Sequence, residues 1–87
     1  MKITITITNC VKDKTFNIQV DNKQKIETTI RVLRENLPEM MQGLGGRVYI
    51  KSKRSKRRIT LSENYEHELI FNGDTLLLNN ELPYDKE

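Results

Sequence analysis

Apolar and polar residues alternate strictly at the start of the chain. Ile3, Ile5 and Ile7 are separated by threonines and preceded by a lysine. A period of two in β-branched residues predicts a strand with one buried face. After the segment "NCVKDK", the same alternation returns in "FNIQV", residues 16–20. Together the two runs predict a β-hairpin with a longer loop.

The apolar period then lengthens, and large apolar residues recur at spacings of four, three and four, at Ile26, Ile30, Leu33 and Leu37. This spacing places one apolar stripe along a helix, over about residues 25–36. Asp21 or Asn22 could cap the start of this helix, and Asp21 with Gln24 has the spacing of a capping box. Pro38 ends it, because the residue before a proline is biased away from helical geometry.

The segment after the helix predicts a loop and three more strands. Residues 38–46, "PEMMQGLGG", contain glycines that favour a loop, and Met40, Met41 or Leu44 could lie beneath the sheet. Strands are predicted in "RVYIKS" and "RITLS", and an irregular or single-turn connection in "ENYEHEL" leads to a last strand in "IFNGDTLLLN". That strand is entered through a tight turn at residues 72–74.

The alternation also assigns side chains to the two faces of the sheet. Tyr49 is expected to point away from the helix, because its neighbours Val48 and Ile50 point inward. In the last strand Leu77 is expected to point away in the same manner, between two inward-facing leucines. The sheet would therefore carry one tyrosine and one leucine on its outer side.

A hairpin, one helix and three further strands make an α+β order. The apolar stripe of the helix is most simply buried against the apolar face of the sheet. A chain of 87 residues is expected to form one domain, here over residues 1–78. Residues 79–87 are polar, with three acids against one lysine, and are expected to fray.

This order resembles the ubiquitin-like (β-grasp) superfamily over residues 1–78. The resemblance is carried by "KTFNIQV", by the helix stripe and by "TLSENYEHELIFNGDTLLL". Within the superfamily the chain is most similar to the small bacterial YukD/EsaB-like proteins, which are encoded with type VII secretion systems. The similarity lies in the "I.IT" opening, "DNKQKIETTI", "GGRVYI" and "LIFNGDTLLL". A denser basic segment and an acidic tail depart from that family.

The resemblance implies a mixed five-stranded sheet on one helix, with the third and fifth strands as neighbours. Tyr49 and Leu77 would then lie close together on the open face, which partners of ubiquitin commonly bind. The two residues form either a contact patch, with Thr4, Thr6 and Lys51 as its polar rim, or ordinary scattered surface. The implied function is that of a cytoplasmic adaptor or regulator of a type VII secretion system, acting by protein–protein binding.

Ubiquitin-type conjugation and sulfur-carrier activity need a C-terminal Gly-Gly. This sequence ends in "PYDKE", and its only Gly-Gly, Gly45 with Gly46, is internal and falls in the predicted loop. Covalent tagging is therefore not expected unless a longer tail is processed off.

The charge of the chain is concentrated in one segment. The formal net charge is +3, from 15 basic and 12 acidic residues. Six of the basic residues lie close together, at Lys51, Lys53, Arg54, Lys56, Arg57 and Arg58. Such a run indicates either a nucleic-acid contact or a solvated hairpin whose charges prevent edge-to-edge strand pairing. No aromatic residue interleaves the run, and Tyr49 is the only stacking candidate nearby.

Candidate chemistry is sparse. No nucleophile stands beside a base, and no paired carboxylates lie in an apolar setting, so an enzyme is not expected. His67, the only histidine, lies between two glutamates and is expected in a solvated loop, while the single Cys10 is expected to be a tolerated small residue. Neither a metal nor a cofactor is expected. The absence of a disulfide pair, a signal peptide and a long apolar stretch favours a cytoplasmic protein without a membrane span.

Overall fold

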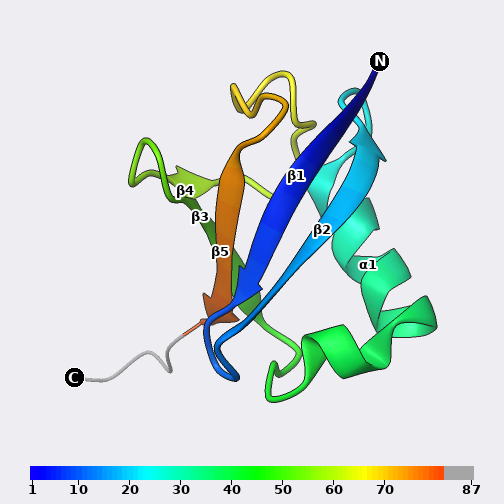
Figure 1. Ribbon diagram of the computed structural model, residues 1–87, viewed down its shortest axis with the longest axis vertical. Coiled ribbons are helices and arrows are strands. Elements are labelled where there is room, and N and C mark those ends of the chain that lie inside the picture. The colour runs from blue at the N-terminus through cyan, green and yellow to red at the C-terminus, as the bar shows by residue number, and fades with distance from the viewer. Residues whose placement is uncertain (82–87) are drawn as a thin grey trace.

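One helix lies across one face of a five-stranded sheet in the computed structural model, which describes residues 1–81 (Figure 1). The strands are β1 (Lys2–Asn9), β2 (Lys14–Asp21), β3 (Val48–Ser52), β4 (Arg58–Ile59) and β5 (Thr75–Asn80). The helices are α1 (Ile26–Asn36) and the short 3-10 helix η1 (Pro38–Met41). The sheet order is β2-β1-β5-β3-β4, in which β1 and β5 are parallel and all other pairs are antiparallel. The predicted α+β architecture, a mixed five-stranded sheet with one helix, is confirmed.

The alternation along the strands produces the core. Ile7 pairs with Phe16 of β2 and with Leu76 of β5, so that one row of apolar side chains crosses three strands on the face covered by α1. Fully burying one such side chain contributes about 1.5–3 kcal/mol. The buried apolar residues are Ile3, Ile5, Ile7, Val20, Ile26, Ile30, Leu33, Met41, Leu44, Ile50, Ile59, Tyr65, Ile70, Leu76 and Leu78.

The start of α1 corrects the predicted cap. Lys25 occupies the position before the helix and makes no side-chain cap, while Asp21 accepts a hydrogen bond from the amide of Lys23 in the preceding turn. The first amides of α1 instead bond to a distant segment: Ile26 donates to the carbonyl of Glu63, and Glu27 to that of Leu61. Backbone carbonyls of the connection between β4 and β5 therefore satisfy donors that a local side chain was expected to satisfy.

The segment after α1 is more regular than predicted. The helix ends at Asn36, and Pro38 begins η1 where only a loop was expected. Met41 and Leu44 are buried beneath the sheet, and Met40 is half-buried. Proline is tolerated in the first turn of a helix because its missing N–H has no partner there.

Two strand boundaries also differ from prediction. The strand predicted in "RITLS" contains only Arg58 and Ile59, because the following backbone turns away to cap α1 and to reach Glu68. In contrast, β5 continues to Asn80 through pairs with β3, so residues 79 and 80 belong to the sheet and not to a frayed tail. The amide of Glu81 donates to the carbonyl of Arg47, and residues 82–87 of the predicted tail lie outside the described residues.

Candidate functional site: the open face of the sheet

The face of the sheet opposite α1 is covered by no helix or strand of residues 1–81 (Figure 1). The register places four side chains in one row across this open face: Thr8 of β1 pairs with Leu77 of β5, Leu77 with Lys51 of β3, and Lys51 with Arg58 of β4. Leu77 is thus the apolar centre of a polar and cationic row. Its side chain is half-buried by these neighbours.

Tyr49 and Leu77 share the open face, as the alternation predicted, but they are not directly opposed. Tyr49 pairs with Asn79, one pleat further along β5, so Tyr49 and Leu77 are diagonal neighbours. Diagonal pairs of this kind remain within reach of an aromatic side chain. Tyr49, like Leu77, is half-buried.

An arginine covers one side of the Tyr49 ring. The guanidinium carbon of Arg58 lies 4.6 Å from the ring centroid, in cation–π geometry. Arg58 is itself held by Glu81, whose Oε2 accepts a hydrogen bond from its Nη2 at 2.6 Å. The apolar surface of Tyr49 is therefore smaller than the sequence suggests, and its exposed part is flanked by a fixed positive charge.

The structure separates Thr4 and Thr6 from Tyr49. Thr6 pairs with Thr75 at the start of β5, whereas Tyr49 pairs with Asn79 near its end. The four intervening steps span about 13 Å. Because β3 runs antiparallel to β5, its first residues lie at the far end of the sheet from the start of β1. The predicted rim is wrong in this respect.

Thr8 takes the place that was expected for the other threonines. It stands beside Leu77, and its hydroxyl lies 3.2 Å from that of Thr15 on β2. Thr6 instead donates a hydrogen bond to Asn17, and the backbone of Thr4 bonds to Asn72 and Gly73. The threonines of β1 have the same spacing in the sequence, and only the register with β5 distinguishes them.

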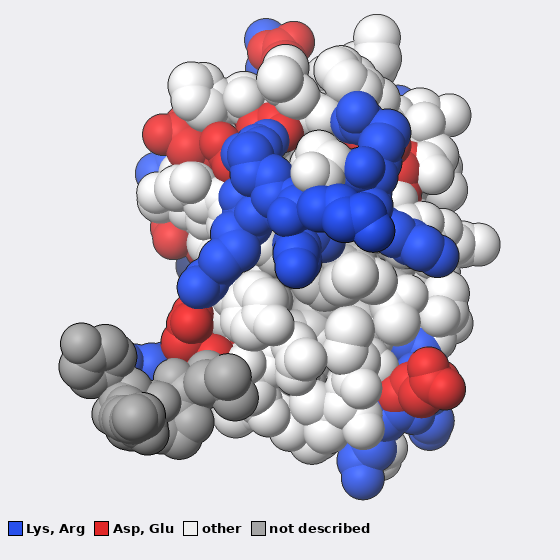
Figure 2. Space-filling view, turned by 90° about the vertical axis from the view of Figure 1, so that its left-hand side faces the viewer, with Lys and Arg blue, Asp and Glu red and all other residues white. Residues whose placement is uncertain are grey.

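The basic segment forms a tight hairpin between β3 and β4. The amide of Ser52 donates to the carbonyl of Arg57, and the amide of Lys56 donates to the carbonyl of Ser52. Ser52 is buried, and its hydroxyl accepts a hydrogen bond from the amide of Ser55. Figure 2, which views the side away from α1, shows lysine and arginine side chains as a band across this surface, above a largely uncharged area.

All three arginines of the hairpin are paired with carboxylates from the last part of the chain. Arg54 binds both oxygens of Asp74 at 3.1 Å, Arg57 binds Glu68 at 3.1 Å, and Arg58 binds Glu81. Hydrogen bonding to Arg54 lowers the pKa of Asp74 and raises the pKa of the guanidinium. Among the basic residues of the hairpin, only Lys51, Lys53 and Lys56 form no ion pair within residues 1–81.

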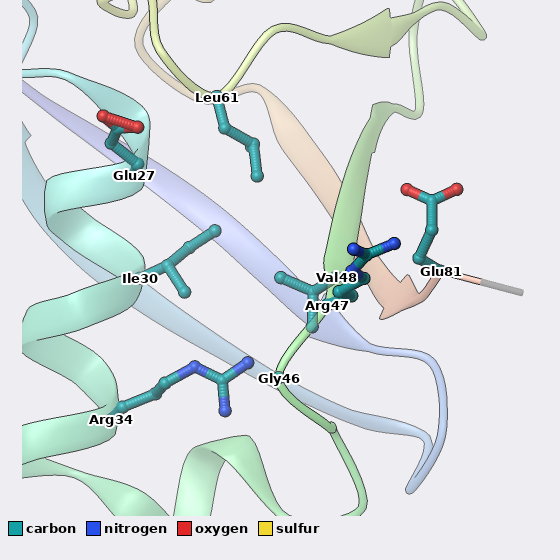
Figure 3. Close-up of a pocket in the computed structure, with 8 residues that line it drawn as sticks. All are labelled: Glu27, Ile30, Arg34, Gly46, Arg47, Val48, Leu61 and Glu81. Atoms are coloured by element: carbon teal, nitrogen blue, oxygen red, sulfur yellow. The ribbon is translucent and has the colours of Figure 1, made fainter. Parts of the chain in front are cut away.

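A groove opens on the other side of the sheet, between α1 and β3 (Figure 3). Ile30, Val48 and Leu61 line it with apolar side chains, and its volume is about 310 Å³. The remaining lining residues are Glu27, Arg34, Gly46, Arg47 and Glu81, so that two acids face two arginines. Because the acidic and basic side chains on its rim are equal in number, the charge of the groove indicates no class of ligand.

The two residues with candidate chemistry lie apart and exposed. Cys10 stands in the turn between β1 and β2, where its thiol lies 3.9 Å from the carbonyl of Thr8. His67 is in the connection between β4 and β5, with its Nε2 at 4.0 Å from Glu63. No helix of residues 1–81 is both long and apolar enough to span a bilayer.

Comparisons with known proteins define the fold. No protein-family model matches the sequence, and no curated protein matches it. The solved structures similar to this chain include a protein designed de novo on the basis of ubiquitin (TM-score 0.69, 17% identity, 99% of this chain and 94% of the other covered). A ubiquitin of Caldiarchaeum subterraneum (TM-score 0.64, 13% identity, 98% and 100% covered) and an Arabidopsis thaliana protein solved by NMR with evolutionary couplings (0.61, 13%, 99% and 95%) are also similar. The chain therefore has the ubiquitin-like β-grasp fold.

Proposed function

We propose that this protein is a non-enzymatic, non-conjugated ubiquitin-like adaptor or regulatory protein that binds a protein partner through the open face of its sheet. The observation that carries the proposal is the row from Thr8 to Arg58, in which Leu77 lies at the centre of a face that no element of residues 1–81 covers. Protein-binding surfaces commonly place a few apolar and aromatic anchors inside a polar rim.

Three side chains provide the principal contacts. Leu77 supplies apolar area, Tyr49 an aromatic edge and a hydroxyl, and Arg58 a guanidinium already fixed against the Tyr49 ring. Tyrosine and arginine are enriched among the residues that dominate binding energy. Because Arg58 is held by Glu81 before any partner arrives, less side-chain entropy is lost on binding.

The lysines of the basic hairpin direct the approach of the partner. Lys51 lies beside Leu77 in the row, and Lys53 and Lys56 extend the positive surface toward the hairpin tip. Positive charges at the edge of a contact surface raise the association rate for an acidic partner more than they raise the final affinity. An acidic surface on a cytoplasmic protein fits this face.

We place the partner in a bacterial type VII secretion system, where this chain would be an accessory component. The similarity to YukD/EsaB-like proteins in "DNKQKIETTI", "GGRVYI" and "LIFNGDTLLL" supports this assignment, and so does the ubiquitin-like fold. Genes for a membrane-bound secretion ATPase and for small WXG-type secreted proteins beside this gene would strengthen it. A genomic neighbourhood without any secretion component would contradict it.

The test is a binding titration against the purified cytoplasmic domains encoded in that neighbourhood. Tyr49→Ala combined with Leu77→Ala is expected to lower affinity at least about tenfold, as truncation of central interface residues commonly does. Val11→Ala combined with Val32→Ala is the matched control, because both valines are exposed apolar side chains outside the open face. Circular dichroism and thermal melting show that each variant is folded.

Two outcomes overturn the proposal. Undiminished binding by the folded Tyr49→Ala and Leu77→Ala variant would mean that the open face is not the contact surface. Tight binding of labelled DNA or RNA at physiological salt, insensitive to the same two substitutions, would mean that the protein acts on nucleic acid through its lysines.

A further inference from the structure

The connection between β4 and β5 exposes two large apolar side chains. Leu69 is 61% exposed and Phe71 is 54% exposed, the highest values for large apolar residues in residues 1–81 apart from Met1. Ile70, between them, is only 2% exposed and belongs to the core. Ile70 therefore packs into the core, while the side chains of Leu69 and Phe71 on either side of it face the solvent.

The backbone at Leu69 is strained. Its φ is +60°, a left-handed conformation that a bulky side chain rarely adopts. Hydrogen bonds hold it there, because the amide of Leu69 donates to Glu66 at 3.1 Å and its carbonyl accepts from Arg54 at 3.1 Å. This conformation leaves the Leu69 side chain exposed between two buried residues, Glu68 and Ile70.

The basic hairpin supplies the neighbouring charge. Arg54 joins the two segments, since it bonds to Leu69 and its guanidinium lies 5.6 Å from the centroid of the Phe71 ring. Arg57 bonds to the carbonyl of Glu68 in the same connection. Leu69 and Phe71 therefore both contact Arg54, and Arg57 is bonded to the residue that precedes Leu69.

The carboxylates that pair with these arginines lie behind them. Asp74 and Glu68 are 11% and 8% exposed, whereas Arg54 and Arg57 are 54% and 48% exposed. With Lys53 and Lys56 the hairpin has four cations against two carboxylates at this point, a local charge of +2. Arg54 and Arg57 therefore face outward, while their carboxylate partners are largely shielded from solvent.

We propose that Leu69 and Phe71, together with Lys53, Arg54, Lys56 and Arg57, form a docking patch for the surface of a bilayer that contains anionic lipids. The two apolar side chains enter the interface between headgroups and acyl chains, and the cations contact the headgroups. Single-stranded nucleic acid binds by stacking its bases on aromatic side chains, and a leucine cannot take part in such stacking. The presence of an exposed leucine beside the phenylalanine therefore favours a lipid ligand over single-stranded nucleic acid. The patch is separate from the contact residues Tyr49 and Leu77.

The test is co-sedimentation of the protein with vesicles. Vesicles of phosphatidylcholine with added phosphatidylserine are expected to bind the protein, and vesicles of phosphatidylcholine alone are expected to bind little of it. Binding should fall as the salt concentration rises, because exposed charges are screened. Absence of binding to the phosphatidylserine vesicles even at low salt would overturn the proposal.

Leu69→Asn combined with Phe71→Ser removes the apolar pair. Asparagine tolerates a left-handed backbone better than leucine, so this variant is expected to fold while vesicle binding drops at least about tenfold. Val32→Ser is the control, because Val32 is an exposed apolar residue on α1 and should have no effect. Equal binding by the folded Leu69→Asn and Phe71→Ser variant would refute the patch.

The contribution of charge is tested separately. Lys53→Gln with Lys56→Asn should weaken binding to phosphatidylserine vesicles by about fivefold for each lysine, with Asn chosen at 56 because φ there is +63°. Lys14→Gln with Lys25→Gln, two exposed lysines on β2 and before α1, removes the same charge elsewhere and should change binding less. An equal loss in both pairs would mean that net charge, and not this patch, attracts the vesicle.

This patch shares Lys53 and Lys56 with the function proposed above, but not the contact residues Tyr49 and Leu77, which separate the two proposals. Tyr49→Ala with Leu77→Ala should leave vesicle binding unchanged, and its loss in that variant would reassign lipid binding to the open face. A labelled single-stranded DNA that binds this protein when phosphatidylserine vesicles do not would replace lipid by nucleic acid as the ligand.

Discussion

Arg57 donates one hydrogen bond to the carboxylate of Glu68 at 3.1 Å and a second to the backbone carbonyl of the same residue at 2.6 Å. The carboxylate also accepts a hydrogen bond from the amide of Thr60 at 2.8 Å. Glu68 is buried, and it thereby ties the basic hairpin to the connection that leads into β5. A segment that the sequence predicted to be either a nucleic-acid contact or a solvated hairpin is thus partly a structural clamp.

Loss of the Glu68 carboxylate should destabilise the protein. Glu68→Ala leaves the guanidinium of Arg57 and the amide of Thr60 without their shared acceptor. Hydrogen bonds to charged groups contribute about 1.5–3 kcal/mol each at most, and Arg57 is half-exposed to water, so we expect a total loss of about 2–3 kcal/mol. Urea denaturation at neutral pH measures it.

Glu66→Ala is the matched control, because Glu66 is exposed and its carboxylate pairs only with the exposed Lys23 among residues 1–81. Exposed ion pairs contribute about 0–1 kcal/mol. Equal losses in the two variants would mean that Glu68 has no special structural role.

The sequence predicted the layers of the fold but not these clamps. A period of two and a helical stripe depend only on local geometry, and Ile5, Ile30 and Leu76 are all buried as expected. Glu66 and Glu68, however, both flank His67 and have the same charge. Only the tertiary position of Arg57 makes one of them a buried partner and leaves the other in water.

Asn9 provides a second long-range connection. Its side-chain amide donates to the carbonyls of Met40 and Gln42, and its oxygen accepts from the amides of Val11 and Lys12. One buried side chain therefore fastens η1 to the β1–β2 turn.

Asn9→Ala should lower the free energy of unfolding by about 1–3 kcal/mol, because it removes four part-buried hydrogen bonds to the backbone. Thermal and urea denaturation measure the loss. Asn17→Ala is the control: Asn17 is exposed on β2 and accepts only a bond from Thr6 in residues 1–81, so a change of less than about 0.5 kcal/mol is expected. A similar loss in both variants would refute the assigned role.

The open face illustrates where sequence reasoning stops. Alternation predicted correctly that Tyr49 and Leu77 face away from α1, because each lies between inward-facing neighbours. Alternation cannot set the register between strands that are distant in the sequence. Thr8, and not Thr4, lies beside Leu77 because of the register between β1 and β5. No local sequence pattern encodes that register.

Tyr65 should make stability depend on alkaline pH. Burial raises the pKa of its phenol to about 12, although a hydrogen bond to Thr29 at 2.8 Å opposes the rise. A phenol is neutral below its pKa, so the folded state favours the neutral form more than the unfolded state does. The resulting stability is complete below about pH 10, the unfolded pKa, and is lost as the pH rises toward 12.

Ultraviolet difference spectroscopy of tyrosinate measures this titration. The phenol of Tyr65 should ionise near pH 12 in the wild-type protein. Tyr65→Phe should remove that step and reduce the loss of stability above about pH 10. An unchanged high-pH step in the folded Tyr65→Phe variant would assign it to another tyrosine.

Gly43 should be intolerant of any side chain. Its φ is +79°, and a Cβ built there would lie 2.6 Å from Cγ1 of Val11. Gly43→Ala therefore combines a left-handed strain of about 1–2 kcal/mol with a steric overlap, and we expect a total loss of about 2–4 kcal/mol. Gly46→Ala is the control, because no heavy atom would lie within 4 Å of its Cβ and its φ is not in the left-handed region.

A double-mutant cycle separates the two causes. Val11→Ala removes the Cγ1 atom responsible for the 2.6 Å contact and leaves the next atoms at 3.3 and 3.4 Å. In that background Gly43→Ala should cost only the backbone term, about 1–2 kcal/mol. If Gly43→Ala costs the same free energy in both backgrounds, the steric overlap with Val11 contributes nothing. Backbone strain alone would then make glycine necessary at position 43, where the segment after η1 passes beneath the β1–β2 turn.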